Sequence, residues 1–157
     1  MSAKVHVILY EPEIPPNTGN IIRLCANTGA QLHLVRPLGF ELDDKRLRRA
    51  GLDYHEYATM KVHDTLSACL QSLPDARLFA LSAKASKPFY ETIFKAGDAL
   101  IFGPETRGLP DEVLASLPEE HRLRLPMVPE NRGLNLSNSV AVAVYEVWRQ
   151  FSFAGGS

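Results

Sequence analysis

The sequence predicts an α/β fold with a mostly parallel sheet and helices on both of its faces. Three observations predict it: short apolar runs alternate with helical segments along the chain, the runs end near Gly or Pro, and 157 residues suffice for one domain with a substantial core. We expect residues 1–157 to form that single domain. In such sheets, ligands bind beyond the carboxyl ends of the strands. The first places to look for a site therefore follow Tyr10, Ser82, Phe102 and Met127.

Five apolar or alternating runs predict the strands. The runs are Val5–Tyr10, Gln31–Val35, Arg77–Ser82, Ala99–Phe102 and Arg122–Met127. Proline follows the first run at Pro12 and the second at Pro37, and each proline favours a loop after its run.

Five segments with helical periodicity or start and stop signals predict the helices. They are Asn17–Thr28, Asp43–Ala50, Asp64–Leu73, Pro110–Leu117 and Leu136–Phe151. Gly29 and Gly51 follow the first two, where a left-handed cap residue belongs.

The final helix carries an apolar stripe at i, i+4, i+7 and i+11, formed by Val140, Val144, Val147 and Phe151. We expect this stripe to pack on the sheet. Tyr145 and Trp148 form a second face that suits a partner subunit.

The net charge, the cysteines and the histidines limit the partners and sites that we expect. The chain has a net charge of −1, so an RNA partner would have to meet a local positive patch. Cys25 and Cys69 form no C-x-x-C pair, and we expect two buried free thiols, with a disulfide as the alternative. The five histidines show no metal-ligand spacing, so we expect no metal site.

We expect no signal peptide in the N-terminal region. The first apolar run is short and is followed directly by Glu11 and Glu13. No apolar run is long enough to span a membrane. We therefore expect a soluble cytoplasmic protein.

The first predicted helix carries an unusual polar stripe formed by Asn20, Arg23 and Asn27. A solvated stripe normally consists of Glu and Lys, since Asn is a poor helix former. The stripe indicates either a face that contacts a partner or an ordinary surface helix.

The turn G-P-E-T-R-G, residues Gly103–Gly108, follows a buried run. It lacks the Walker lysine and the G-x-G-x-x-G fingerprint. Glycine lets the backbone approach a ligand closely. Glu105 can accept hydrogen bonds from a ligand or RNA, or pair with Arg107 or with a nearby backbone amide. The alternative is a plain turn before a capped helix.

The loop Pro129–Ser139 is rich in amides and hydroxyls, with Gly133 among them. The polar residues are Asn131, Asn135, Ser137, Asn138 and Ser139. One helix cap needs one such residue. The loop is therefore typical of a binding loop for a polar heterocycle.

Four basic residues fall within five positions of the segment Asp43–Gly51, at Lys45, Arg46, Arg48 and Arg49. They can bind phosphates. Alternatively, acids at the start of a helix and bases at its end complement the helix dipole without any partner.

Three segments together resemble the three motifs of the SPOUT class of RNA methyltransferases. They are P-P-N-T-G-N-I-I-R-L-C-A-N-T-G (Pro15–Gly29), L-I-F-G-P-E-T-R-G-L-P (Leu100–Pro110) and L-R-L-P-M-V-P-E-N-R-G-L-N-L-S-N-S-V-A-V-A-V-Y-E (Leu123–Glu146). With L-Y-E-P-E-I-P-P-N-T-G-N and D-D-K-R-L-R-R-A-G-L-D-Y-H-E, the chain is similar to the bacterial tRNA 2′-O-methyltransferases of the wobble cytidine or uridine in leucine tRNAs. The resemblance covers nearly the whole chain.

The resemblance implies a deep trefoil knot in the C-terminal part, S-adenosylmethionine as the methyl donor, and a homodimer with Tyr145 near the subunit contact. Matched motif by motif, the catalytic residues of the family fall on Arg23, Asn17, Glu105 and Asn135. The donor pocket falls on Leu81, Gly103, Leu125 and the loop that contains Gly133, Leu134 and Ser137. The family often has serine at the position of Gly133, so here only the backbone can serve.

Phosphate contacts to tRNA are expected from Arg46, Arg48, Arg49 and Arg107. Free arginine holds its proton too tightly to act as a base. Arg23 therefore either stabilises the developing alkoxide while water or an RNA phosphate takes the proton, or passes the proton on in a desolvated site. Two other functions stay open: a methyltransferase of another RNA position, and a non-catalytic RNA-binding module.

Overall fold

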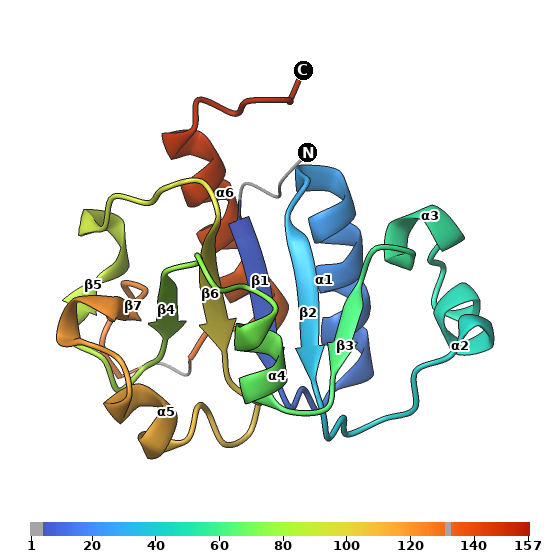
Figure 1. The fold of residues 1–157 in the computed structure, drawn as a ribbon, viewed down its shortest axis with the longest axis horizontal. Coiled ribbons are helices and arrows are strands. Elements are labelled where there is room, and N and C mark those ends of the chain that lie inside the picture. The colour runs from blue at the N-terminus through green and yellow to red at the C-terminus, as the bar shows by residue number, and fades with distance from the viewer. Residues whose placement is uncertain (1–4, 131–132) are drawn as a thin grey trace.

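A seven-stranded sheet forms the centre of the molecule (Figure 1). The computed structural model describes residues 5–130 and 133–157. The strands follow the order β3-β2-β1-β6-β4-β7-β5, and every pairing is parallel. Their bounds are β1 Val5–Tyr10, β2 Gln31–Val35, β3 Lys61–His63, β4 Leu78–Leu81, β5 Lys87–Pro88, β6 Asp98–Phe102 and β7 Arg122–Arg124. The predicted α/β class is confirmed.

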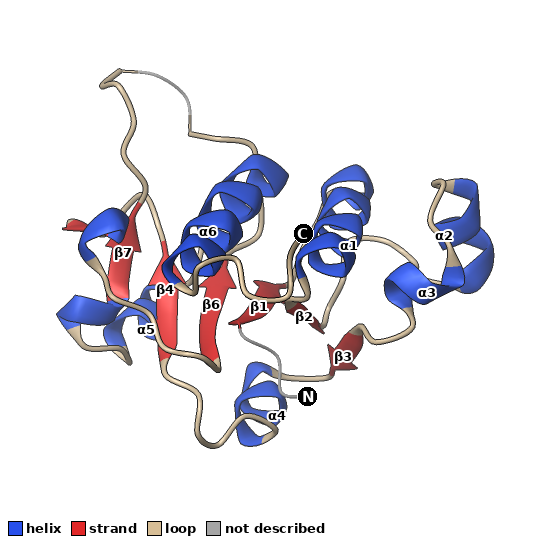
Figure 2. Cartoon of the chain, turned by 90° about the horizontal axis from the view of Figure 1, so that it is seen from above, coloured by secondary structure: helices blue, strands red, loops and turns tan. Residues whose placement is uncertain are grey.

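Helices cover both faces of the sheet (Figure 2). Their bounds are α1 Pro15–Thr28, α2 Asp44–Arg49, α3 Tyr54–Tyr57, α4 Leu66–Gln71, α5 Asp111–Ala115 and α6 Leu136–Gln150. Single 3₁₀ turns lie at Phe89–Glu91 and Glu119–His121. The helices α1 and α6 pack on one face, while α4 and α5 pack on the other. None of the described helices combines the length and the apolar composition needed to cross a membrane.

Side chains alternate between the two faces along each strand, as the pleat requires. In β1, Val7 and Leu9 pack with α1 and α6, whereas Ile8 packs with α4 and α5. The predicted stripe of α6 lies in the core, where Val140, Val144 and Val147 are fully buried.

Most predicted elements are present, and the differences concern their ends and the shortest pieces. The bounds of β1 and β2 match the prediction, and Gly29 caps α1 with a φ of 80°. The predicted strand Arg122–Met127 ends at Arg124, and the helix expected at Asp64–Leu73 covers Leu66–Gln71. The elements α3, β3 and β5 were not predicted. Both cysteines are free and buried, as predicted.

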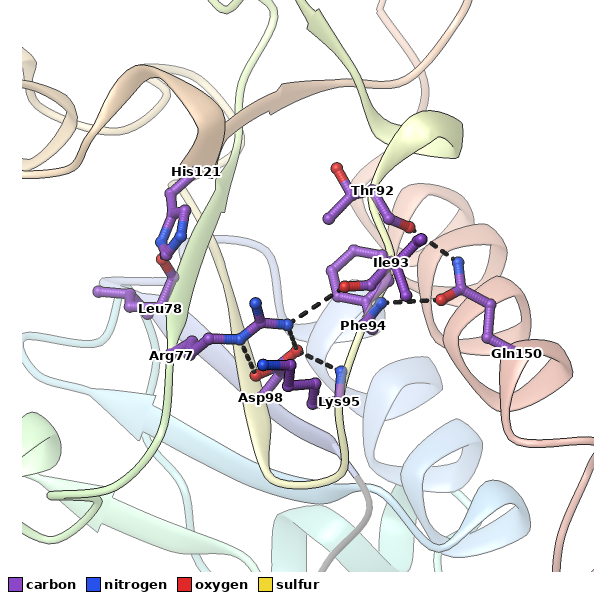
Figure 3. A network of polar contacts seen from close by, with 9 residues as sticks. All are labelled: Arg77, Leu78, Thr92, Ile93, Phe94, Lys95, Asp98, His121 and Gln150. Atoms are coloured by element: carbon purple, nitrogen blue, oxygen red, sulfur yellow. Dashed lines mark hydrogen bonds and ion pairs between the residues drawn. The ribbon is translucent and has the colours of Figure 1, made fainter.

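A polar network at the amino end of β6 joins three elements (Figure 3). Asp98 is buried, and its carboxylate accepts bonds from Arg77 Nε at 2.9 Å and Arg77 Nη2 at 2.6 Å. Gln150 of α6 accepts from the Phe94 amide at 2.8 Å and donates to the Thr92 carbonyl at 3.0 Å. A buried carboxylate needs such partners. The network holds the strands in place at the end opposite the expected site.

Candidate functional site

A cavity of about 390 Å³ opens at the carboxyl ends of β4, β6 and β7, next to the start of α6. Two segments that α5 and β7 separate in the chain form much of its wall: the turn after β6 and the loop before α6. Its lining includes Leu81, Phe102, Gly103, Leu109, Leu125, Met127, Gly133 and Leu134 on the apolar and backbone side, and Asn17, Ser82, Glu105, Asn135 and Ser139 on the polar side. This size and mixture suit a small organic ligand.

Glu105 ties the turn after β6 to the segment that follows β1. Its carboxylate accepts hydrogen bonds from the backbone amides of Glu13 and Ile14, both at 2.8 Å. The side-chain amide of Asn17 donates to the same carboxylate at 3.2 Å. Of the alternatives for Glu105, pairing with backbone amides is the one the structure shows.

The side chains of Asn17 and Asn135 extend this chain of hydrogen bonds to α6. Asn135 Nδ2 donates to Asn17 Oδ1 at 3.0 Å. Asn135 also caps α6, because its Oδ1 accepts from the Ser137 amide at 2.9 Å. Three residues that the motifs nominated, 118 positions apart at the extremes, therefore form one connected unit at the cavity.

Glu13 belongs to the same unit and was missed by the sequence analysis. Its carboxylate accepts from the amide of Thr106 at 2.8 Å and from the Thr106 hydroxyl at 2.7 Å. These bonds lower the pKa of Glu13, the Thr106 backbone amide being the largest cause. Since Glu13 also donates its own amide to Glu105, the two loops hold each other in both directions. In the sequence, Glu13 stands out only as a second acid after the first apolar run, and this position indicates no hydrogen-bond partner.

Glycine at position 103 serves the turn itself. A Cβ there would lie 2.3 Å from the Leu109 nitrogen and 2.4 Å from the Gly108 carbonyl carbon. The sequence predicted that this glycine makes room for a ligand, whereas the structure shows that it makes room for the returning backbone. At Gly133, by contrast, a Cβ would meet nothing within 4 Å.

Ser137 does not line the cavity. Its hydroxyl donates to Asn135 Oδ1 at 2.6 Å, so it acts on the site through Asn135. Asn131, which was part of the expected binding loop, lies outside the described residues.

Arg23 is not among the residues that line the cavity. It lies on the exposed side of α1, as do Asn20 and Asn27. Its Nε donates to Glu56 of α3 at 2.9 Å, and Nη2 donates to the Gly51 carbonyl that follows α2. The hydrogen bond to Glu56 and the charge of Glu56 raise the pKa of Arg23.

The comparisons with known proteins fit this geometry. Residues 4–145 match the model of the SpoU rRNA Methylase family. The chain belongs to that family. It is 62% identical over 149 residues to the tRNA (cytidine(34)-2′-O)-methyltransferase of Methylovorus glucosotrophus, covering 95% of this chain and 97% of that one. It is 56% identical over 151 residues to the protein of the same name from Escherichia coli K12, covering 96% of each.

Solved structures agree. A structure from work on the 2-OH methylation of C/U34 on tRNA superimposes with a TM-score of 0.86 at 50% identity, covering 94% of this chain and 96% of that one. AviRb, a SpoU methyltransferase from Streptomyces viridochromogenes solved with AdoMet, superimposes with a TM-score of 0.79 at 20% identity. That match covers 100% of this chain and 60% of AviRb, and it shows the SpoU fold.

The four arginines predicted to bind phosphates do not line the cavity, whereas Arg124 does. Arg46, Arg48 and Arg49 are exposed on α2, which lies beyond the β3 edge of the sheet in Figure 1. Arg46 pairs with Glu41 at 2.9 Å and with Asp43, whereas Arg48 and Arg49 have no ion-pair partner among the described residues.

Arg107 lies next to the cavity but is held by acids. Its Nη2 is 3.3 Å from Glu11 Oε1, and its Nε is 3.6 Å from Glu13 Oε2. Of the four arginines expected to bind phosphates, Arg107 is the one close to Glu105 in the sequence. An RNA phosphate would have to compete with the carboxylates of Glu11 and Glu13 for this guanidinium.

Proposed function

We propose that this chain transfers a methyl group from S-adenosylmethionine to the ribose 2′-OH of the wobble nucleotide, cytidine or uridine 34, of tRNA, with leucine tRNAs as substrates. The observation that carries the proposal is the connected unit of Glu105, Asn17 and Asn135 at the cavity of a SpoU-family chain. The names of the relatives, which cover nearly the whole chain, support the nucleotide and the reaction.

The cavity suits the proposed methyl donor. Leu81 and Leu125 supply apolar walls for an adenine ring, and the backbone of the turn after β6 is exposed for polar groups. The donor supplies an activated methyl group on a sulfonium. The residues of the chain therefore have to orient the two reactants and handle one proton, and orientation alone can account for about 7–11 kcal/mol of the barrier in favourable cases.

Glu105, Asn17 and Asn135 act as the orienting frame. Each bond between them joins a different loop or helix end, so the turn, the start of α1 and the start of α6 keep one relative position. The wobble base lies in a single-stranded loop and can leave the stack without the opening of a duplex.

Arg23 is the proposed stabiliser of the developing alkoxide. Its raised pKa favours a group that stays charged, while water or an RNA phosphate takes the proton. Arg23 faces α3 and not the cavity of its own chain, so we propose that it completes the site of a second copy in a homodimer. The exposed Val142 and Tyr145 of α6 support such a contact.

The test is incubation of the purified protein with labelled S-adenosylmethionine and leucine tRNA, followed by digestion and identification of the methylated nucleoside. We expect label in 2′-O-methylcytidine or 2′-O-methyluridine at position 34. The matched control is a transcript with a 2′-deoxynucleotide at that position, which removes the acceptor and nothing else.

Each other outcome points elsewhere. Label that persists with the deoxy transcript would place the reaction at another nucleotide. Label in total tRNA from a strain lacking the gene, but not in the leucine transcript, would have one of two meanings. Either leucine tRNA is not the substrate, or the enzyme acts only on tRNA that already carries another modification. Binding of the donor without label in any RNA would favour the non-catalytic module.

A further inference from the structure

Three metal-ligand side chains meet on the face of the sheet that α4 covers. A ring nitrogen of His33, a ring nitrogen of His63 and the Cys69 sulfur all lie within 4.8 Å of one another. His33 is on β2, His63 on β3 and Cys69 on α4. None of them lines the cavity described above. The sequence shows no metal-ligand spacing because the fold, and not a local motif, brings these residues together.

The distance between the two ring nitrogens approaches the distance between two nitrogen ligands of a zinc ion. His33 Nδ1 and His63 Nε2 are 3.0 Å apart. Two nitrogens at Zn–N distances of about 2.0–2.1 Å in a tetrahedral site are separated by about 3.3 Å. A widening of a few tenths of an ångström, with rotation of the half-buried His63 ring at the edge of the sheet, would therefore admit a cation where the two rings now share a proton.

His6 supports the orientation of His33. Its Nδ1 lies 3.0 Å from His33 Nε2, on the other side of the ring from His63. A cation on His33 Nδ1 would fix the remaining proton on Nε2, which then donates to His6. Histidine ligands of metals are usually held through their second nitrogen in this way.

The donor set selects the kind of cation. We propose that His33, His63 and Cys69 bind one zinc ion, with a water molecule in the fourth position. Two imidazoles and one thiolate suit zinc. The cluster contains no carboxylate, so magnesium and calcium do not fit it.

The protonation states are compatible with this. Burial lowers the pKa of His33 to about 3, so its ring is neutral and offers a lone pair at pH 7. Burial raises the pKa of the Cys69 thiol to about 11, so zinc must displace its proton: the S–H bond breaks, the S–Zn bond forms, and one proton is released to solvent.

The structure also assigns the ion a place in the fold. The elements β2 and β3 lie at one edge of the sheet, and α4 is only six residues long. A zinc ion bound by residues of β2, β3 and α4 would hold this short helix against the edge of the sheet. The second cysteine, Cys25, lies in α1 against the opposite face of the sheet and belongs to no such cluster among the described residues.

The experiment is titration of the tag-free, chelator-treated protein with Co²⁺ as a spectroscopic probe, followed by displacement with Zn²⁺. We expect one equivalent per chain, a thiolate-to-cobalt charge-transfer band, and loss of that band on addition of zinc. Cys69→Ser is expected to abolish the band and His63→Asn to weaken binding at least tenfold, whereas Cys25→Ser keeps both the band and the affinity.

The proposal is overturned if the unmodified protein shows no band at micromolar cobalt, or if Cys69→Ser retains it. Because Cys69 is fully buried, its variant is checked for folding by circular dichroism. If it does not fold, His63→Asn decides: His63 is only partly buried, and unchanged binding in this variant would contradict the site.

Discussion

At the scale of single residues, Asn17 connects Glu105 with Asn135 at the cavity. It is buried, and it uses both ends of its amide: Nδ2 donates to Glu105 and Oδ1 accepts from Asn135. A carboxylate in the same place offers acceptors only. The hydrogen bond between Asn17 and Glu105 therefore depends on the side-chain NH₂ group of Asn17.

Asn17→Asp is expected to destabilise the fold in a pH-dependent way. The substitution sets two carboxylates against each other in a buried place, which costs about 2 kcal/mol of unfolding free energy at pH 8. The two groups can share a proton at lower pH because like charges raise the pKa of one of them. The cost, measured by urea unfolding, should therefore shrink as the pH falls from 8 to 5.

Asn20→Asp is the matched control. It adds the same charge to the exposed side of the same helix and should show no such pH dependence. Equal pH profiles for the two variants would contradict the assigned contact between Asn17 and Glu105.

At the scale of elements, the turn after β6 is built from backbone packed on backbone. Gly103 has no room for a methyl group, because the atoms that face its Cβ direction belong to the main chain of Gly108 and Leu109 and cannot rotate away. Gly19, inside α1, has open space around the same position. The two glycines therefore differ in what they contribute.

Gly103→Ala is expected to lower the free energy of unfolding by about 2–3 kcal/mol through overpacking, whereas Gly19→Ala should raise it by up to about 1 kcal/mol through helix propensity. Thermal and urea unfolding of both variants measure this. Equal effects in the two variants would show that the close approach at position 103 is not real.

The elements that the sequence predicts are those whose own residues determine them. The strand β1 is apolar except for His6, and α6 carries a stripe with helical period, so both were predicted with nearly correct bounds. The three-residue strand Lys61–His63 has one apolar residue, and its existence depends on pairing with β2. The motifs nominated Asn17, Glu105 and Asn135, but only the fold shows that Asn17 bonds to both of the others. Only the fold shows that Arg23 does not line the same cavity.

At the scale of the whole molecule, the nominated residues separate into two groups. The cavity group lies at the carboxyl ends of β4, β6 and β7 and includes Asn17, whereas Arg23, further along α1, bonds to Glu56 of α3 and to Gly51 after α2. Arg48 and Arg49 belong to the second group. The proposed reaction brings both groups to one methyl acceptor, and the proposed pair of chains can provide that arrangement. The trefoil knot implied by the resemblance stays a prediction.

Mixed dimers of Arg23→Lys and Glu105→Gln chains test this arrangement. Each variant alone should be inactive. A dimer with one chain of each kind, isolated through two different tags, should recover about half of the wild-type activity, because one of its two symmetry-related sites combines an intact Glu105 with the Arg23 of the other chain.

If Arg23 served its own cavity, both sites of the mixed dimer would be damaged and no activity would return. Failure of the two tagged chains to copurify would contradict the dimer itself. The measured quantity in each case is methyl transfer per dimer at saturating donor.

The position of β6 in the sheet has a consequence for synthesis on the ribosome. This strand lies between β1 and β4, which do not pair with each other. A nascent chain that has emerged only as far as Leu81 carries both neighbours with the slot between them empty, and unpaired strand edges attract other chains. Asp98–Phe102 fills that gap when it emerges, and β7 then joins β4 to β5. The last residues of the cavity wall to emerge are those between Gly133 and Ser139. The strands of the sheet are therefore synthesised before the last residues of the cavity wall.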